Sequence, residues 1–381
     1  MFKKSLIAVA ALSALAGSAM AADVQIYGRI DTGFRLTGVN YDQIDQSDET
    51  NFEMASGNYT GSRVGIKGSE DLGNGLTVGF VLENGFDSDT GAQKYDGIFG
   101  REAIVYLEGG FGKIAAGKMG ILNGMAGSFA IGNFNPFGTG WGEVGSQTQL
   151  WGAGFESRYN NMISYVTPDF AGVKVYAQYS FGGNFKDGKV VGEEGKTTTN
   201  RYYALGATYT NGGLNLIGIV DSVNEAQTHG QYEKEDTFRV TIGGSYDFGV
   251  VKPYISAAYF KDGQISDPFD AHAYADGLEN KDWEGFGVTL GATAPLFGGK
   301  AHAMVGYMDA EGEDNRFVGL AKDDFTRWLV GFGYEYSLSK RTTVYADAGY
   351  FKDEYKSADG DNYPKDEPDA YQAAVGLVHY F

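Results

Sequence analysis

Charged side chains stand in the middle of segments that are otherwise apolar or small. In VQIYGRIDTGF, residues 24–34, Arg29 and Asp31 interrupt such a segment. Arg63 in SRVGIKGSE and Glu83 in LTVGFVLENGF occupy similar positions. Guanidinium and carboxylate groups held at fixed intervals can bind ions, pair with one another or set a local electrostatic potential. Which of these applies depends on the elements that carry them.

Nucleophilic and metal chemistry find little support in the sequence. The chain has no cysteine, which excludes disulfides and thiolate metal sites. Its four histidines, His229, His272, His302 and His379, show no spacing typical of metal ligands. No nucleophile elbow is visible in the sequence. The acidic segments YDQIDQSDE and DGDNYPKDEPD could hold calcium, but their irregular spacing and Pro364 favour solvated loops. We therefore predict no catalytic residue, no metal site and no cofactor.

The charged positions belong to segments with a two-residue period. In FRVTIGGSYDF, Phe238 and Ile242 share one face, and Arg239 and Thr241 share the other. Such alternation is typical of strands with one apolar and one polar face. About sixteen such segments, most of them roughly 10–13 residues long, follow one another along the chain. We expect the first over residues 24–35 and the last over 369–381.

The connections between these segments alternate in length. The short ones are EDLGNG, GGFG, PDFAG, NGG, DFGV, LFGG and LSKR. The long, mostly polar ones are 36–60, 87–99, 120–157, 183–200, 224–235, 262–282, 312–322 and 354–368. Short turns on one rim and long loops on the other are typical of outer-membrane barrels, whose apolar face points outward to lipid. The predicted fold class is therefore all-β, a transmembrane antiparallel β-barrel of about sixteen strands, which is wide enough to leave an aqueous channel.

The first 21 residues indicate export. A basic MFKK, the apolar run LIAVAALSALA and a small-residue AMA site are typical of a signal peptide, which we expect to be cleaved after Ala21. No linker divides residues 22–381, so we expect a single β-barrel domain. No later apolar run is long enough for a membrane helix, which needs about 20 residues. A closed barrel is then the remaining way to cross a bilayer.

The chain is strongly acidic. Its net charge is −19, and loss of Lys3 and Lys4 with the signal peptide makes it −21. Because phosphate affinity comes from Lys and Arg, a nucleic-acid partner is not expected.

The longest connection, residues 120–157, differs from the other long loops. It is rich in glycine and aromatic residues, and Glu143 and Glu156 are its only acids. A loop of this length and composition is expected to pack against something. We expect it to fold into the barrel; a trimer contact or a lid over the mouth is the alternative.

Several segments together resemble the general diffusion porins of Gram-negative outer membranes, especially the neisserial and beta-proteobacterial type. They are VQIYGRIDTG, SRVGIKGSEDLGNGL, VLENGFDSDTG, FGREAIVYLEGGFGKIAAGK, RYNNMISYVTPDFAGV, LSKRTTVYADAGY and VGLVHYF. The resemblance implies a sixteen-stranded homotrimeric barrel with an infolded third loop. It also implies contacts with outer-membrane lipid, lipopolysaccharide and the barrel-assembly machinery, with Phe381 resembling the assembly signal.

The resemblance also implies a charged pore constriction. Basic-wall positions match Arg29, Arg63, Lys118 and Arg158, and pore acids match Glu83 and, on the loop, Glu143. Alternation independently turns Arg29, Arg63 and Glu83 inward, whereas it leaves Lys118 open. The loop segment NPFGTG lacks the acidic cluster of related porins. We therefore expect a weak anion preference, opposed by the acidic outer loops.

The expected function is passive diffusion of ions and small hydrophilic solutes, and not enzymatic activity. Two alternatives remain: a barrel acting mainly as an adhesin or receptor, which long loops alone would allow, and a barrel lipid hydrolase. The second would need a Ser/His pair on the lipid-facing surface near a rim.

Overall fold

The computed structural model of the chain describes residues 23–41, 48–141, 147–152, 155, 157–186, 189–226, 235–266, 281–314, 322–356 and 366–381. Over these ranges the chain consists of strands, turns and one short 3-10 helix, η1 (Gln147–Leu150). None of the helical structure in these ranges is long and apolar enough to span a membrane.

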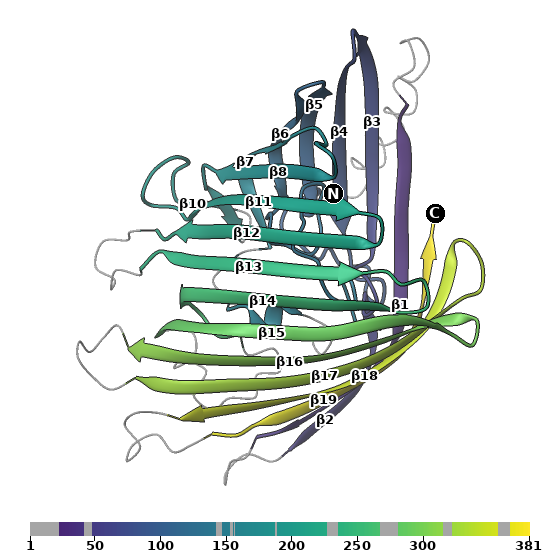
Figure 1. The fold of residues 1–381 in the computed structure, drawn as a ribbon, viewed down its shortest axis with the longest axis vertical. Coiled ribbons are helices and arrows are strands. Elements are labelled where there is room, and N and C mark those ends of the chain that lie inside the picture. The colour runs from purple at the N-terminus through teal and green to yellow at the C-terminus, as the bar shows by residue number, and fades with distance from the viewer. Residues whose placement is uncertain are drawn as a thin grey trace.

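The strands follow one another along the chain (Figure 1). Their bounds are β1 (Gln25–Asn40), β2 (Glu49–Ser56), β3 (Arg63–Gly73), β4 (Leu76–Gly85), β5 (Glu102–Gly109), β6 (Gly112–Gly120), β7 (Arg158–Val166), β8 (Val173–Ser180), β9 (Asn184–Lys186), β10 (Lys189–Val191), β11 (Arg201–Asn211), β12 (Leu214–Asn224), β13 (Thr237–Tyr246), β14 (Lys252–Gly263), β15 (Lys281–Leu296), β16 (Gly299–Asp314), β17 (Asp323–Ser337), β18 (Thr342–Lys356) and β19 (Asp369–Tyr380).

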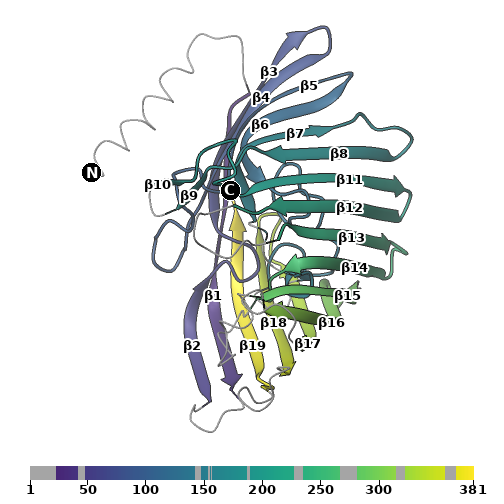
Figure 2. The same ribbon diagram turned by 90° about the vertical axis from the view of Figure 1, so that its left-hand side faces the viewer.

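The strands close into a ring by antiparallel pairing of neighbours. β1 pairs with β19 on one side and with both β2 and β3 on the other, so β2 and β3 act as two parts of one wall strand. β8 pairs with β11 past the separate β9–β10 hairpin. Figure 2 shows β1 between β2 and β19 at the closure. The barrel is closed and sixteen-stranded, which confirms the predicted fold class.

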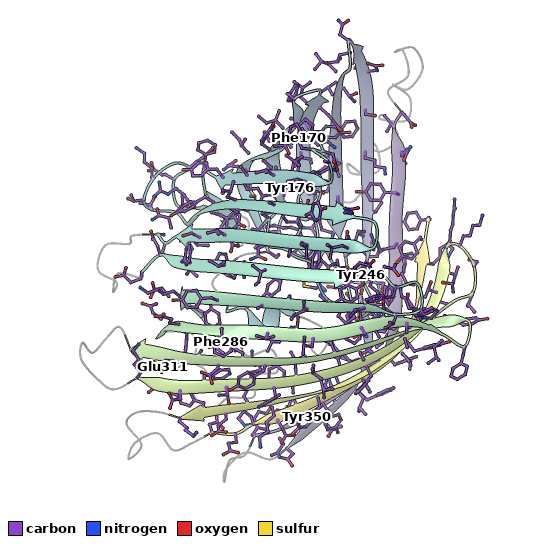
Figure 3. The ribbon with its side chains drawn as sticks, viewed as in Figure 1. Phe170, Tyr176, Tyr246, Phe286, Glu311 and Tyr350 are labelled. Atoms are coloured by element: carbon purple, nitrogen blue, oxygen red, sulfur yellow. The ribbon has the colours of Figure 1, made fainter. Side chains whose placement is uncertain are left out.

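The barrel has an apolar outside, and its inner face carries charged side chains. On β1, Ile30 and Phe34 are 42% and 47% exposed, whereas Asp31 between them is fully buried. On β17, Trp328 is 57% exposed and its neighbour Arg327 is fully buried. Figure 3 labels further side chains carried by this wall, among them Phe286 and Tyr350. The faces are therefore inverted relative to a soluble sheet, as a lipid-facing barrel requires.

The alternation of short turns and long connections is confirmed, but the first long loop is shorter than predicted. β1 continues to Asn40, and residues 49–56, expected to lie in a loop, form β2. In this extension Thr32 pairs with Ser56, and the rings of Phe34 and Phe52 stack at 5.8 Å. Residues 49–56 were not recognised as a strand because many of them are polar. Backbone pairing with β1, and not burial of side chains, holds β2 in the wall.

Candidate functional site

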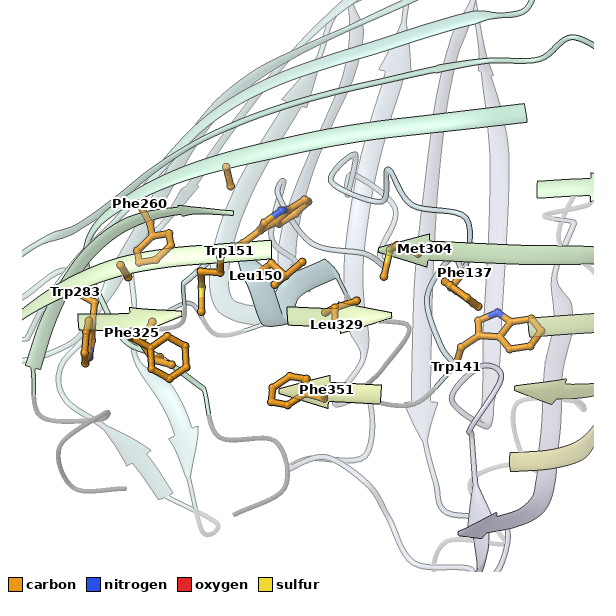
Figure 4. Close-up of a cluster of buried hydrophobic side chains, with 14 of the residues drawn as sticks. Phe137, Trp141, Leu150, Trp151, Phe260, Trp283, Met304, Phe325, Leu329 and Phe351 are labelled. Atoms are coloured by element: carbon orange, nitrogen blue, oxygen red, sulfur yellow. The ribbon is translucent and has the colours of Figure 1, made fainter. Parts of the chain in front are cut away.

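The described residues of the connection between β6 and β7 (121–141, 147–152, 155 and 157) pack against the inner wall. The loop side chains Phe137, Trp141, Leu150 and Trp151 are at most 4% exposed and belong to one apolar cluster with wall residues of β14–β18 (Figure 4). Wall members of this cluster include Phe260, Trp283, Met304, Phe325, Leu329 and Phe351. Burial of large apolar side chains against the wall stabilises this position by about 1.5–3 kcal/mol per side chain.

Glycines in the wall make room for the loop. At Gly287 of β15, a Cβ atom would lie 1.7 Å from the carbonyl oxygen of Leu150, and at Gly306 of β16 it would lie 2.2 Å from Leu150 Cδ1. At Gly333 of β17 it would lie 2.7 Å from the Trp141 ring. At Gly287 a Cβ would meet the backbone of the loop, whereas at Gly306 and Gly333 it would meet loop side chains, which would have to shift.

The outgoing arm of the loop is held on the opposite part of the wall. Leu122 and Phe129 are buried with Met119, Tyr159 and Tyr202 in a second apolar cluster. A polar contact accompanies this packing, because the backbone N–H of Ser128 donates to Glu102 Oε1 at 3.0 Å. The loop is thus anchored on two parts of the wall. Between them Ile131, Phe134 and Pro136 lie against Gly206 of β11, Gly243 of β13 and Gly291 of β15.

Three arginines gather beside this loop. Arg101 Nε lies 2.6 Å from Glu83 Oε1, and Arg63 Nη1 lies 3.6 Å from the same oxygen. Tyr27 donates its hydroxyl to Glu83 Oε2 at 3.1 Å. Glu83 is therefore shared by two guanidinium groups and is part of the basic wall.

The third arginine, Arg158 at the start of β7, has no ion pair with any described carboxylate. Its Nε donates to the carbonyl oxygen of Arg101 at 2.9 Å, and its guanidinium lies 4.9 Å from the ring centre of Tyr95. Burial raises the pKa of the Tyr95 hydroxyl, but the charges of Arg158 and Arg101 outweigh it and hold that pKa below its usual value.

These groups line a cavity of about 430 Å³, which we call the arginine-lined cavity. Its charged lining residues, among those described, are Arg63, Lys94, Arg101, Arg158 and Arg239. The loop contributes Asn123, Gln149, Gly152 and Phe155, and Ser266 follows β14. No Asp or Glu is among the described lining residues. The cavity therefore carries an excess of positive charge.

A second cavity, of about 420 Å³, lies near the short turns before β14 and β16. Lys252, Lys300 and Glu335 line it, and Lys300 Nζ lies 2.5 Å from Glu335 Oε1. His302 also lines it and donates from Nδ1 to the loop carbonyl of Pro136 at 2.6 Å. The histidine thus has a structural contact with the loop.

The other residues singled out from the sequence lie elsewhere. Arg29 faces inward, but its Nη1 donates to Thr60 Oγ1 at 3.0 Å and its guanidinium lies 5.2 Å from the Tyr380 ring, so it is not among the lining residues of either cavity. Phe381 pairs with Gly28 through two backbone hydrogen bonds of 3.1 Å, which extend the β1–β19 closure. Glu143 lies outside the described residues.

Lys118 is also not among the residues that line the arginine-lined cavity. Its Nζ donates to Asn160 Oδ1 at 2.8 Å, and its pairing with Ala103 places it on the face opposite the buried Met119. A register shift between Gly117 and Met119 interrupts the ladder here. This irregularity could not be read from the sequence KIAAGK.

Arg101 was missed by sequence reasoning. Strict alternation along β5 places it on the face of Val105, which is 54% exposed. However, Arg101 precedes the first residue of β5, so its side chain is free to turn toward Glu83. The only sequence signal was its position directly before a strand.

A closed barrel with an apolar outside, charged side chains on its inner face and a loop packed inside it defines a transmembrane β-barrel channel. The model of the Gram-negative porin family matches residues 8–356. An outer membrane porin of Bordetella pertussis is 35% identical, covering 92% of this chain and 94% of that protein. The major outer membrane protein P.IB of Neisseria meningitidis serogroup A is 31% identical over the whole of both chains.

Solved structures agree on the fold. The anion-selective porin from Comamonas acidovorans has a TM-score of 0.64 and 23% identity, covering 95% of this chain and all of that one. The trimer form of OmpT from Vibrio cholerae has a TM-score of 0.56 and 16% identity, again covering 95% of this chain and all of that one. The chain belongs to the Gram-negative porin family: it is an outer membrane porin, and not an enzyme.

Proposed function

We propose that the protein is a passive diffusion channel for ions and small hydrophilic solutes, constricted by loop 120–157 at the arginine-lined cavity. The observation that carries this proposal is the position of the loop, which packs on two parts of the inner wall and borders the arginine-lined cavity of about 430 Å³. A sixteen-stranded barrel is wide enough for an aqueous channel, and an inserted loop narrows it.

The constriction has a weak preference for anions. Five cationic side chains line the cavity, and three nearby acids offset part of their charge. Glu83 pairs with Arg63 and Arg101, Asp221 with Arg239, and Asp87 with Lys94, whereas Arg158 has no ion pair with a described carboxylate. Salt screens charges beyond about 8 Å at physiological ionic strength, so the groups nearest the solute dominate over the acidic outer loops. The Comamonas acidovorans structure, described as an anion-selective porin, supports the same sign.

The mature protein comprises residues 22–381 after cleavage following Ala21, and it forms a homotrimer in the outer membrane. The trimer form of OmpT supports the oligomeric state. Phe381, paired with Gly28 at the closure of the barrel, acts as the signal read by the assembly machinery, and the exposed apolar belt contacts lipid and lipopolysaccharide.

Conductance in planar bilayers tests the channel. Purified, folded protein should raise the conductance in groups of three equal steps, and vesicles containing it should be permeable to small sugars but not to larger ones. Heat-denatured protein is the control. Folded protein that produces neither conductance steps nor sugar permeability would exclude the proposed function.

A further inference from the structure

We propose that the buried pair Arg327–Asp353 is a positioning element that fixes the width of the arginine-lined cavity. The pair does not line the cavity itself, but it holds two segments that do. This inference rests on the proposed function, because it assigns the pair a role in the geometry of the constriction.

The pair has a rigid two-point geometry. Arg327 of β17 donates from Nε to Asp353 Oδ1 at 2.8 Å and from Nη2 to Asp353 Oδ2 at 2.6 Å. The two side chains are 0% and 1% exposed. The guanidinium also lies 5.1 Å from the ring centre of Phe325 and 4.3 Å from that of Phe351. A planar fork bonded in this way has little freedom to move.

The remaining donors of Arg327 reach the segments that border the cavity. Nη1 donates to the carbonyl oxygen of Gln149 at 3.0 Å, and Nη2 donates to that of Ser266 at 2.8 Å. Ser266 in turn donates its hydroxyl to Gln149 Oε1 at 2.6 Å. Gln149 and Ser266 both line the arginine-lined cavity. One guanidinium therefore ties the returning arm of the loop and the segment after β14 to two neighbouring wall strands.

The position of Gln149 is further fixed by the residue that follows it. Leu150 is fully buried against Gly287 and Gly306 of the wall. The apolar contact sets how deeply η1 sits, and Arg327 sets where the carbonyl group of Gln149 points. Buried ion pairs often add little net stability relative to apolar replacements. We therefore assign the Arg327–Asp353 pair a positioning role, which rests on its contacts with the loop.

A second buried pair shows the contrast. Arg239 of β13 is bonded to Asp221 at 3.0 and 2.7 Å, and Asn123 of the outgoing arm donates to the same aspartate at 3.2 Å. Arg239 itself lines the cavity, so its removal would change both charge and position. The Arg327–Asp353 pair offers a cleaner test, because its two charges cancel and neither residue lines the cavity.

The test is the double variant Arg327→Met/Asp353→Leu, recorded in planar bilayers beside the wild type. We expect a folded trimer with an unchanged reversal potential, a larger variance of the open-channel current and closure at a lower voltage. Gln149→Ala, which removes the side-chain link to Ser266, should show a smaller change in the same direction. Arg35→Met/Glu53→Leu removes a half-exposed pair that joins β1 and β2 and serves as the control with wild-type currents.

A folded double variant with wild-type current variance and closing voltage would overturn the inference. If the double variant does not fold, Arg327→Lys decides the question, because it keeps the charge but loses the planar fork. Increased variance in Arg327→Lys supports the positioning role, and wild-type variance refutes it. Failure of the wild type to conduct would instead exclude the proposed function, so the two failures are distinguishable.

Discussion

Glu83 Oε1 lies 2.6 Å from Arg101 Nε, so this acid is bonded within the basic wall and does not face it from the other side of the channel. Together with the longer contact to Arg63, it offsets one of the three positive charges gathered there. The field at the cavity therefore depends on which of these side chains keep a carboxylate partner.

Replacing Glu83 by Gln should make the channel more anion-selective. The substitution keeps a hydrogen-bonding side chain of nearly the same shape but removes a negative charge beside Arg63 and Arg101. The reversal potential in a potassium chloride gradient should move further toward the equilibrium potential of chloride. Glu53→Gln, at a half-exposed pair on β2, is the control. A shift of Glu83→Gln toward cations would contradict the placement of Glu83 in the basic wall.

Arg158→Gln should weaken the anion preference more than Arg29→Gln. Both substitutions remove one positive charge, but Arg158 lines the cavity and Arg29 is held away from it by Thr60 and Tyr380. The difference between the two reversal potentials is the measurement. Equal shifts would show that position inside the barrel, and not contact with the cavity, determines the effect of a charge.

The anion preference should decline at alkaline pH. The usual pKa of a tyrosine hydroxyl is about 10. Because Arg158 and Arg101 hold the pKa of Tyr95 below that value, its hydroxyl loses its proton at a lower pH than the hydroxyl of an exposed tyrosine would. The resulting negative charge offsets part of the basic cluster, and lowering the pH restores the preference. Reversal potentials measured at increasing pH test this, with Tyr95→Phe as the control. A decline that is equally large in Tyr95→Phe would assign the effect to another group.

Gly287→Ala should alter conductance, because the added Cβ would lie 1.7 Å from the carbonyl oxygen of Leu150 and the loop is expected to shift away from it. Gly218→Ala in β12 is a matched control, since no atom lies within 4 Å of the position its Cβ would take. The single-channel conductance of both variants is compared with that of the wild type. Wild-type conductance in folded Gly287→Ala would show that the wall strand shifts to accommodate the added Cβ and that the loop stays in place.

Much of the fold could be predicted because each strand of a lipid-facing barrel alternates between residues that face lipid and residues that face the interior. Ile30 and Phe34 are exposed on one face and Asp31 is buried on the other, as alternation requires. β2 was missed because pairing with β1, and not side-chain burial, defines it.

The site was less predictable, because it depends on register and on strand ends. The two-residue period places Arg327 on the polar face of its strand. Its bond to Asp353, however, depends on the register between β17 and β18. Arg101 precedes its strand and so escapes the alternation rule. The placement of Lys118 depends on a local register shift, which cannot be predicted from the residue types around it.

The reversal potential of the purified wild-type protein in a potassium chloride gradient tests the central claim most directly. A diffusion channel whose constriction is the arginine-lined cavity should conduct in steps and give a small reversal potential with the sign of an anion preference. Folded protein that does not conduct, or that shows clear cation selectivity, would contradict this account.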